Sequence, residues 1–369
     1  MELLSTEKVN RRDWIKVAGG TVAGLAIGAA GGYFAAQPSM PQPGVAQTVT
    51  ETQTAAGPAK GGQKAKAAIL LSGTIDDLGW NTQHYMGLQY IASQGRETHY
   101  TELVAPPDVE KVARDYVALG YNYIIYGGGW AREGFLAVSK AFPDSAHVLV
   151  EGADEDQGPN TQTIMDQSQQ TGYIEGQIAA RMTKSKVIGW VIGMEVPDIN
   201  LWTAGGLAGI RDYDPKIKRL YSVVGDFEDP AKGKEATLGM IEAGADVIIE
   251  CGDGTSFGIA EAAKAHKVPV CSQWWGSPNY ADGKGPKVLG DDLAVIGGYC
   301  DWAPAFWHGV QRFEEGTFGY RGDYPSYQTG ALKMVVNPTL SPDWIKMAGD
   351  LAAKIARGEI AVPTASPSS

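Results

Sequence analysis

Two consecutive series of alternating strand-like and helix-like segments constrain the fold of this chain most strongly. From Lys66 onward, short β-branched or apolar runs alternate with amphipathic stretches. The first series has predicted strands at 67–73, 98–104, 121–128, 147–152 and 161–166. After a helix at 172–182, the second series has predicted strands at 186–193, 219–227, 246–252 and 268–273. Such alternation implies parallel sheets flanked by helices, and two series of similar length imply two similar α/β lobes.

The composition excludes several classes of protein. The chain has 369 residues, with 31 Lys and Arg against 42 Asp and Glu, a formal net charge of −11. It has no basic stripe of the kind that binds nucleic acid. Its 44% hydrophobic content, 48 Gly and 20 Pro indicate a packed, turn-rich protein. The three cysteines, Cys251, Cys271 and Cys300, lack the paired spacing of a zinc site or a disulfide framework. We therefore predict buried structural thiols and no metal site. Cys251 and Cys271 each end an apolar strand-like run, so a disulfide between neighbouring strands is the alternative. We also expect no cofactor.

The N-terminal segment, residues 1–36, is typical of an export signal. Arg11 and Arg12 are followed by DWIK and then by an uncharged, glycine-rich stretch from Val17 to Ala36. The arginine pair resembles a twin-arginine signal, and the uncharged stretch is also long enough for a membrane anchor. Residues 37–65 are rich in Pro, Gln, Thr, Ala and Gly, which predicts a flexible linker. We predict a protein at the outer face of the cell membrane.

The loops that follow the predicted strands carry most of the unusual residues. Ligands of parallel α/β sheets bind where strands end and helices begin. Here these loops read TIDDLGWN, GGGWAR, MEVPDINLW, GDFEDP, CGDGTSFG and SQWWGSP. They contain the aromatic residues Trp80, Trp130, Trp202, Phe227, Phe257, Trp274 and Trp275. Individually each is compatible with core packing, but together they favour a flat ring held between aromatic faces.

The first loop and a second-lobe loop also supply polar candidates. Trp80 and His84 are four residues apart, and thus on one face of a helix. The Asn81 amide offers both a donor and an acceptor, which suits a purine edge. The alternatives are an N-cap for Asn81, a packing histidine for His84 and a turn residue for Asp77. For Asp253, the alternatives are a ligand acceptor and a helix cap.

These motifs resemble the basic membrane protein family, the purine-nucleoside-receptor-like family of ABC transporter solute-binding proteins. The first-loop string is GTIDDLGWNTQHYMGL. HYTELV, GYIEGQIAARMTKSKVIGWV, VPDINLWTAGGLAGI and DFEDPAKGKEATLGMIEAGADVI follow in order, as do ALKMVVNP and ARGEIAVPT. The resemblance runs from about Lys66 to Thr364.

The resemblance implies a type I periplasmic-binding-protein fold, with two Rossmann-like lobes joined by a three-strand hinge. We expect an N-terminal lobe of 66–168 plus about 274–318 and a C-terminal lobe of 169–273 plus about 319–345. A C-terminal helix and loose tail would occupy 346–369. The resemblance also implies a purine nucleobase or nucleoside as ligand, the 253–254 loop in the cleft, and an ABC permease as partner.

The chain departs from the nucleoside-binding members of that family. Where they carry an Asp and a later Lys for ribose, this chain has Gln273, Trp274 and Trp275, and VLGDDLAVIG contains no Lys. We therefore favour a nucleobase or similar flat heterocycle. The predicted ligand-binding residues are Asp77, Trp80, Asn81, His84, Trp130, Asp166, Trp202, Phe227, Asp253, Gly254, Gln273, Trp274 and Trp275.

We predict a binding protein that acts by lobe closure and is not an enzyme. The alternatives are an exported nucleoside hydrolase and a ligand sensor of the same fold. A hydrolase is disfavoured because the chain has no DxDxxxDD pattern of aspartates that could bind calcium near the first strand. Gly252, Gly254 and Gly258 resemble a dinucleotide fingerprint. The acid expected about twenty residues later is Gln273 here, which argues against an NAD enzyme.

Overall fold

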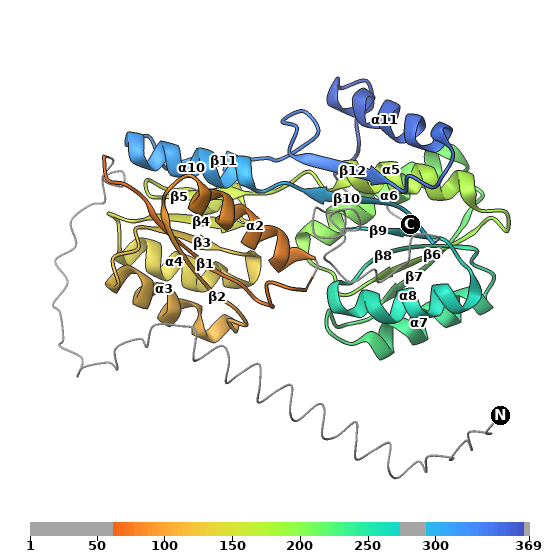
Figure 1. Ribbon diagram of the computed structural model, residues 1–369, viewed down its shortest axis with the longest axis horizontal. Coiled ribbons are helices and arrows are strands. Elements are labelled where there is room, and N and C mark those ends of the chain that lie inside the picture. Colours follow the sequence, from red (N-terminus) through yellow and green to blue (C-terminus); the bar gives the residue numbers. More distant parts are fainter. Residues whose placement is uncertain (1–61, 78, 274–292, 365–369) are drawn as a thin grey trace, which may run out of the picture. The chain divides into compact units, whose positions relative to one another are not determined.

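The computed structural model describes residues 62–77, 79–273 and 293–364 of the chain. All of them lie in one compact unit, Ala56–Ser369, and form two six-stranded sheets flanked by helices (Figure 1). The signal predicted for 1–36 and most of the linker predicted for 37–65 lie outside the described residues. Within those described residues, no helix combines the length and apolar character needed to cross a bilayer.

The first sheet contains the strands of the first predicted series and one strand from near the C-terminus. Its order is β11-β5-β4-β3-β1-β2, and all neighbouring strands are parallel. The strands are β1 (Lys66–Leu70), β2 (Glu97–Thr101), β3 (Tyr123–Tyr126), β4 (Ala146–Val150), β5 (Thr161–Ile164) and β11 (Arg321–Asp323). Its helices are α2 (Trp80–Ser93), α3 (Val109–Ala118), α4 (Arg132–Ala141) and α10 (Ala303–Glu315).

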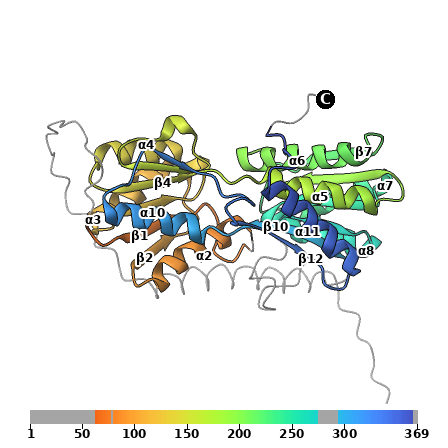
Figure 2. The same cartoon turned by 90° about the horizontal axis from the view of Figure 1, so that it is seen from above.

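Helices cover both faces of this sheet, which explains why its central strands are apolar throughout. Side chains alternate between the two faces of a strand. Ile69 of β1 therefore packs in a core with Leu88 of α2 and Phe306 of α10. The next residue, Leu70, packs in the opposite core with Phe135 of α4. Figure 2 shows α10 beside α2, and the two helices contact each other. Burial on both faces is typical of parallel sheets.

The second sheet has the order β12-β10-β9-β8-β6-β7, with only β12 antiparallel to its neighbour. Its strands are β6 (Val187–Ile192), β7 (Lys218–Val223), β8 (Val247–Cys251), β9 (Val270–Ser272), β10 (Ala294–Cys300) and β12 (Leu332–Val336). One face is covered by α5 (Gln169–Met182), α6 (Pro197–Tyr213) and α11 (Pro342–Ala356). The other is covered by α7 (Pro230–Glu242) and α8 (Ser256–His266).

The nine strands predicted between residues 67 and 273 and the helix predicted at 172–182 are all present, but the lobes predicted for two later segments are wrong. β10 was expected in the first lobe, yet it pairs with β9 and β12 in the second sheet. β11 was expected in the second lobe, yet it pairs with β5 in the first sheet. Apolar patterning shows that a segment is a buried strand, but the choice of sheet depends on backbone pairing over long sequence separations.

Three segments carry the chain between the two sheets, as expected for a three-strand hinge. They are 165–168, 301–302 and 324–331, which link β5 to α5, β10 to α10 and β11 to β12. Backbone hydrogen bonds join these segments to one another or to the end of β11. Met165 N–H donates to Asp323 O at 3.0 Å, Gln167 N–H to Pro325 O at 2.7 Å, and Asp301 N–H to Ala331 O at 2.9 Å. The fold is therefore the two-lobe α/β architecture predicted from the sequence.

Helices α5 and α6 pack with almost no space between their backbones. A Cβ atom at Gly205 of α6 would overlap the carbonyl oxygen of Gln169, and one at Gly172 of α5 would overlap that of Trp202. Gly206 faces the ring of Trp190, which is completely buried in β6. Glycine at these positions allows the two helices to cover the sheet in close contact.

The three cysteines are free, buried thiols. Cys251 ends β8 and Cys271 lies in the adjacent β9, where its register partner is Ile249. Burial raises the pKa of all three thiols well above the ordinary value. These residues therefore act as small apolar core side chains, as their sequence context predicted.

Candidate functional site

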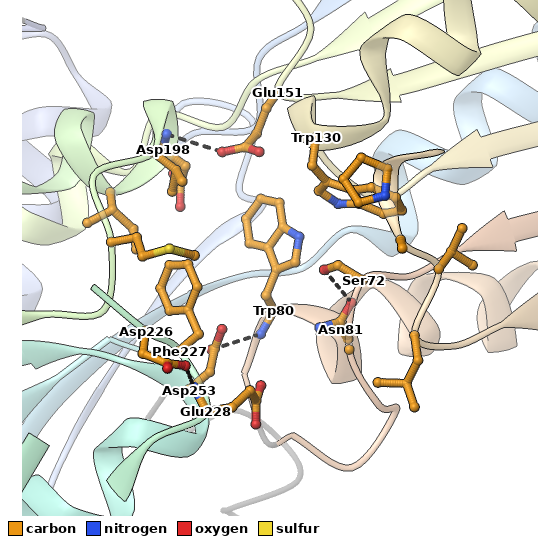
Figure 3. Close-up of a pocket in the computed structure, with 18 of the residues that line it drawn as sticks. Ser72, Trp80, Asn81, Trp130, Glu151, Asp198, Asp226, Phe227, Glu228 and Asp253 are labelled. Carbon is orange, nitrogen blue, oxygen red and sulfur yellow. Dashed lines mark hydrogen bonds between the residues drawn. The ribbon is translucent and has the colours of Figure 1, made fainter. Parts of the chain in front are cut away.

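A cavity of 490 Å³ lies where loops of both sheets meet. Its volume is within the range of small-molecule sites. Its walls come from loops that follow β1, β2, β3, β4, β6, β7 and β8, and Figure 3 shows most of the lining side chains. The lining residues are Ser72, Gly73, Trp80, Asn81, Leu103, Val104, Ala105, Pro106, Trp130, Glu151, Met194, Val196, Asp198, Ile199, Asp226, Phe227, Glu228, Cys251 and Asp253.

The carboxylate of Asp77 holds the first turn of α2 in place. It accepts hydrogen bonds from the backbone N–H groups of Gly79 at 2.9 Å, Asn81 at 3.0 Å and Thr82 at 3.0 Å. It also accepts from the Asn81 amide at 2.8 Å and from the Thr82 hydroxyl at 2.8 Å. Asp77 does not line the cavity, so it is a turn residue that supports the helix, which was the alternative to a ligand-binding role. Asn81 does line the cavity, and Asp77 fixes its orientation.

Replacement of Asp77 by alanine is expected to lower the free energy of unfolding by about 2–3 kcal/mol. The substitution leaves several buried donors at the start of α2 without their charged acceptor. Urea unfolding of the purified variant would measure this loss. Asp76→Ala is the matched control, because Asp76 is the exposed neighbour. Equal stability of the two variants would contradict the capping role.

The indole of Trp80 is fixed at the cavity wall by contacts on several sides. Its Nε1–H donates to the carbonyl oxygen of Gly127 at 2.7 Å. Its ring contacts Trp302 edge-on, with centroids 5.7 Å apart. His84 lies behind it, fully buried and stacked on Trp302 at 4.5 Å. Burial lowers the pKa of His84 to about 4, so this ring is neutral at physiological pH. His84 thus supports Trp80 and does not line the cavity.

Trp130 provides a second indole, from the short helix Gly129–Ala131 after β3. Its ring lies against Gly128, where a Cβ atom would be 2.7 Å from Nε1. Among the described residues, no group accepts a hydrogen bond from this buried Nε1–H. Trp130 therefore offers an aromatic surface to the cavity and retains an unused donor.

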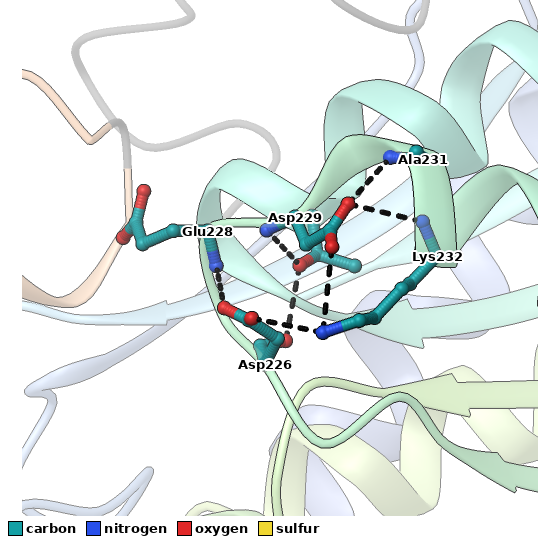
Figure 4. Close-up of polar contacts among 6 residues, drawn as sticks. Asp226, Glu228, Asp229, Ala231 and Lys232 are labelled. Carbon is teal, nitrogen blue, oxygen red and sulfur yellow. Dashed lines mark hydrogen bonds and ion pairs between the residues drawn. The ribbon is translucent and has the colours of Figure 1, made fainter.

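The loop after β7 places Phe227 and Glu228 at the opposite wall. Gly193 leaves room for the Phe227 ring, which a Cβ atom there would overlap. Asp229 caps α7 by accepting from the Ala231 and Lys232 N–H groups at 3.0 and 3.2 Å. Lys232 also pairs with Asp226 at 3.2 Å, as Figure 4 shows. This network holds the loop and gives Asp226 a cationic partner, which it shares with Asp229.

Asp253 begins the short helix that precedes α8 and has a left-handed backbone, with φ +45°. Its carboxylate accepts from the Trp80 backbone N–H at 3.4 Å. This bond connects the second sheet's loop to the N-terminus of α2. Burial raises the pKa of Asp253 well above its ordinary value, and the negative charges of Asp77 and Glu228 add to the effect.

Glu151 and Asp198 form a second acidic group that the sequence analysis did not select. Glu151 directly follows β4 and accepts from the backbone N–H groups of Gly129 at 3.0 Å and Asp198 at 3.3 Å. Asp198 lies in the first turn of α6, next to buried Asp166. Burial and the charge of Asp198 raise the pKa of Asp166 well above normal. Glu151 follows a predicted strand and Asp198 lies where a helix begins, so their positions in the sequence indicated a place near the cavity. The prediction favoured aromatic residues in these loops and omitted both acids.

The stability of the protein is expected to depend on pH through Glu151. Burial and the nearby Asp198 raise the pKa of Glu151 from 4.5 to about 7. The folded state therefore holds the proton more tightly than the unfolded state. The stability gained in this way is complete below pH 4.5 and is lost as the pH rises through about 7.

Urea unfolding at several pH values would measure this dependence. One pKa unit corresponds to about 1.4 kcal/mol, so wild type should lose up to about 3 kcal/mol relative to Glu151→Gln between pH 4.5 and 8. Glu133→Gln, at an exposed site on α4, serves as control and should follow wild type. Parallel curves for wild type and Glu151→Gln would contradict the prediction.

Of the predicted ligand-binding residues, the structure brings five into the cavity lining: Trp80, Asn81, Trp130, Phe227 and Asp253. Trp202 instead packs on Trp190 in the core and donates to Glu175 at 3.0 Å. Trp202 lies within α6, after the loop that follows β6, and its side chain points into the core beneath the helix and not into the cavity.

The remaining predicted residues lie around or outside this cavity. Gly254 packs against Glu228, where a Cβ atom would be 2.7 Å from the carboxylate. Gln273 is buried and accepts from the Thr171 hydroxyl at 3.3 Å. Asp166 is buried behind Asp198. The predictions for Trp274 and Trp275 fall on residues that the structure does not describe.

Comparison with known proteins gives one consistent result. A family profile described as ABC transporter substrate-binding protein PnrA-like matches residues 64–287. The chain is 25% identical to a putative ABC transporter glucose-binding protein of Haloferax volcanii, over 76% of this chain and 68% of that one. It is 23% identical to a purine-binding protein of Brucella abortus, over 82% and 84%. A solved solute-binding protein of Conexibacter woesei shares the fold, with a TM-score of 0.67, 24% identity and coverage of 81% and 99%.

Proposed function

The chain belongs to the PnrA-like family of ABC transporter substrate-binding proteins, and from this premise we propose that it captures a purine nucleobase or related flat heterocycle. Proteins of this kind work outside the cytoplasm and deliver a small molecule to a membrane permease. The observation that supports a ring-shaped ligand is the set of aromatic side chains on both sides of one cavity: Trp80 and Trp130 from the first lobe and Phe227 from the second.

The polar groups of the cavity suit the edge of such a ring. Asp198, Glu228 and Asp253 provide carboxylate acceptors for ring N–H and exocyclic amine donors. Asn81 provides an amide whose orientation Asp77 fixes. Stacking between aromatic rings adds about 0.5–1.5 kcal/mol beyond the burial of area. A ligand held on both faces and along one edge would be oriented as well as bound.

Lobe closure is the binding mechanism in this proposal. Two hydrogen bonds already connect the lobes at the cavity, Trp80 N–H to Asp253 and Asp198 N–H to Glu151. Each joins a carboxylate of one lobe to the start of a helix of the other, where the helix dipole favours negative charge. A ligand that contacts both walls stabilises the closed state over the open one, and this difference drives the equilibrium.

Export by a twin-arginine-like signal and docking of the closed form on an ABC permease complete the proposal. The sequence RRDWIK and the following uncharged stretch support the signal. We place the mature protein at the outer face of the cell membrane, and we propose a binding function without catalysis.

Native mass spectrometry of the purified protein, followed by denaturation and identification of the released molecule, tests the ligand class. Release of an unmodified purine base or other flat heterocycle would support the proposal. Release of a sugar would contradict it while leaving the family and the fold in place. Incubation with nucleosides would separate a binder from a hydrolase, because a binder returns them intact.

A further inference from the structure

The cavity contains acidic groups without matching cations. Asp226 and four other acidic residues, Glu151, Asp198, Glu228 and Asp253, line it. Among the described residues, none of these four forms an ion pair, whereas Asp226 is paired with Lys232. The described lining includes no Lys, Arg or His.

The four groups come from both lobes and lie on two sides of Trp80. In the view of Figure 3, Glu151 and Asp198 lie above the Trp80 indole, and Asp253 and Glu228 lie below it. Glu151 belongs to the first lobe and the other three to the second. A ligand between Trp80 and Phe227 would therefore meet carboxyl groups at both of its ends.

Two buried acids at this wall have to share a proton. Asp198 is only 3% exposed, and its carboxyl group forms a hydrogen bond with that of Asp166, which requires one of the two to be protonated. The carboxyl group of Asp198 points toward the cavity in Figure 3. Behind it, Asp166 has no hydrogen-bond partner other than Asp198 in the described part of the chain. A buried pair of acids is costly to ionise fully, and a bound ligand that supplies a donor or a positive charge lowers this cost.

We propose that the cavity selects a positively charged ligand over neutral and anionic molecules of the same shape. This inference rests on the proposed function and adds the charge of the ligand to it. Electrostatic attraction to the unpaired carboxylates and cation–π contact with Trp80 and Trp130 both favour a cation. An anion meets the opposite: the ionised members of this acidic group repel it, and the described lining holds no cation to offset them.

The buried acids add a second measurable consequence. Burial is the main cause of the raised pKa of Glu151, Asp198, Glu228 and Asp253. Among the acids that face them, Asp77, Asp226 and Glu250 raise the pKa of Glu228 or Asp253 further, whereas a hydrogen bond with Asp166 lowers that of Asp198. A bound positive charge counteracts this effect and favours the ionised forms. Binding of a cation should therefore release protons to the buffer.

Matched ligand sets that differ in charge would test the proposal on the full-length protein. The purine set is a doubly N-methylated adeninium ion, adenine and urate. The pyridine set is the N-methylnicotinamide cation, nicotinamide and nicotinate. The sugar set is glucosamine, glucose and glucuronate. Isothermal titration gives each dissociation constant, and titration in buffers of different ionisation enthalpy gives the number of protons released.

Within the set that binds, we expect the cation to bind about 10-fold more tightly than the neutral member and about 100-fold more tightly than the anion. Asp198→Asn and Glu151→Gln keep the shape of the wall and should reduce this preference. The exposed Glu133→Gln should leave it unchanged. The cation should release more protons than the neutral member of the same set.

The outcomes separate this inference from the proposed function. Binding of an anion as tightly as its neutral partner would overturn the charge selection while leaving a ring-binding function intact. Binding within the sugar set alone would overturn the heterocycle as ligand, and the order within that set would still decide the charge selection. Absence of binding by every member of the three sets would contradict both proposals.

Discussion

Replacement of Trp80 by alanine is expected to raise the dissociation constant for the ligand about 10- to 100-fold. Stacking of one ring on an aromatic side chain contributes about 1–3 kcal/mol, and 1.4 kcal/mol corresponds to a factor of ten. The indole is held at the cavity wall by its bond to Gly127 and its contact with Trp302, so the bound ring meets a surface that is already in place. Isothermal titration with the ligand identified by mass spectrometry measures the change.

Two further variants separate the loss of stacking from a general loss of structure. Trp80→Phe retains an aromatic face but loses the hydrogen bond to Gly127, and it should weaken binding less than alanine does. Phe257→Ala removes an aromatic ring that is 40% exposed on α8 and does not line the cavity. It should bind like wild type. An affinity of Trp80→Ala equal to that of wild type would show that the ligand does not lie on this wall.

The second large effect concerns stability. Gly205→Ala is expected to lower the free energy of unfolding by about 3 kcal/mol or more, because the added methyl group overlaps the backbone of Gln169. A flexible side chain moves away from such an overlap, but a carbonyl oxygen in a helix moves only if α5 and α6 separate. Separation would expose apolar residues that now cover the second sheet, among them Ile174 and Ile210.

Gly239→Ala is the matched control for this substitution. Gly239 also lies within a helix, α7, but it is exposed and an added Cβ atom would have no neighbour within 4 Å. Alanine there should stabilise the protein by about 0.5–1 kcal/mol, because it restricts the unfolded chain and favours the helix. Thermal and urea unfolding of both variants give the comparison. If both variants were more stable than wild type, the close packing of α5 and α6 would not be a constraint.

The acidic lining of the cavity helps to distinguish among the ligands that members of this family bind. Relatives with known names include a glucose-binding and a purine-binding protein, so membership of the family leaves the ligand open. Sugars and nucleobases both accept stacking on an aromatic face and hydrogen bonds to carboxylates. An unpaired acidic lining distinguishes among ligands by their charge, which is why the matched sets include both scaffolds.

Much of the candidate site could be predicted because loop positions follow from element order. Trp80, Asn81, Trp130, Phe227 and Asp253 lie after strands that the apolar runs identified, and parallel strands end at the same edge of a sheet. His84 and Trp202 follow the same rule in sequence but lie in helical turns that face the core. One residue further along a helix turns a side chain by about 100°, and sequence position alone does not give the rotation of the helix.

The sequence by itself determined the α/β alternation, the two lobes and the loops that carry the candidate site. These features depend on local periodicity and chain order, which the sequence contains directly. Only the tertiary structure decided that β10 lies in the second sheet and β11 in the first. It also decided that Asp77 supports α2 without lining the cavity, and that Glu151 and Asp198 line it. Each of these depends on contacts between residues that are far apart in the chain or on the direction in which a side chain points. Pairing, burial and unpaired charge arise only when the two sheets and their helices pack together.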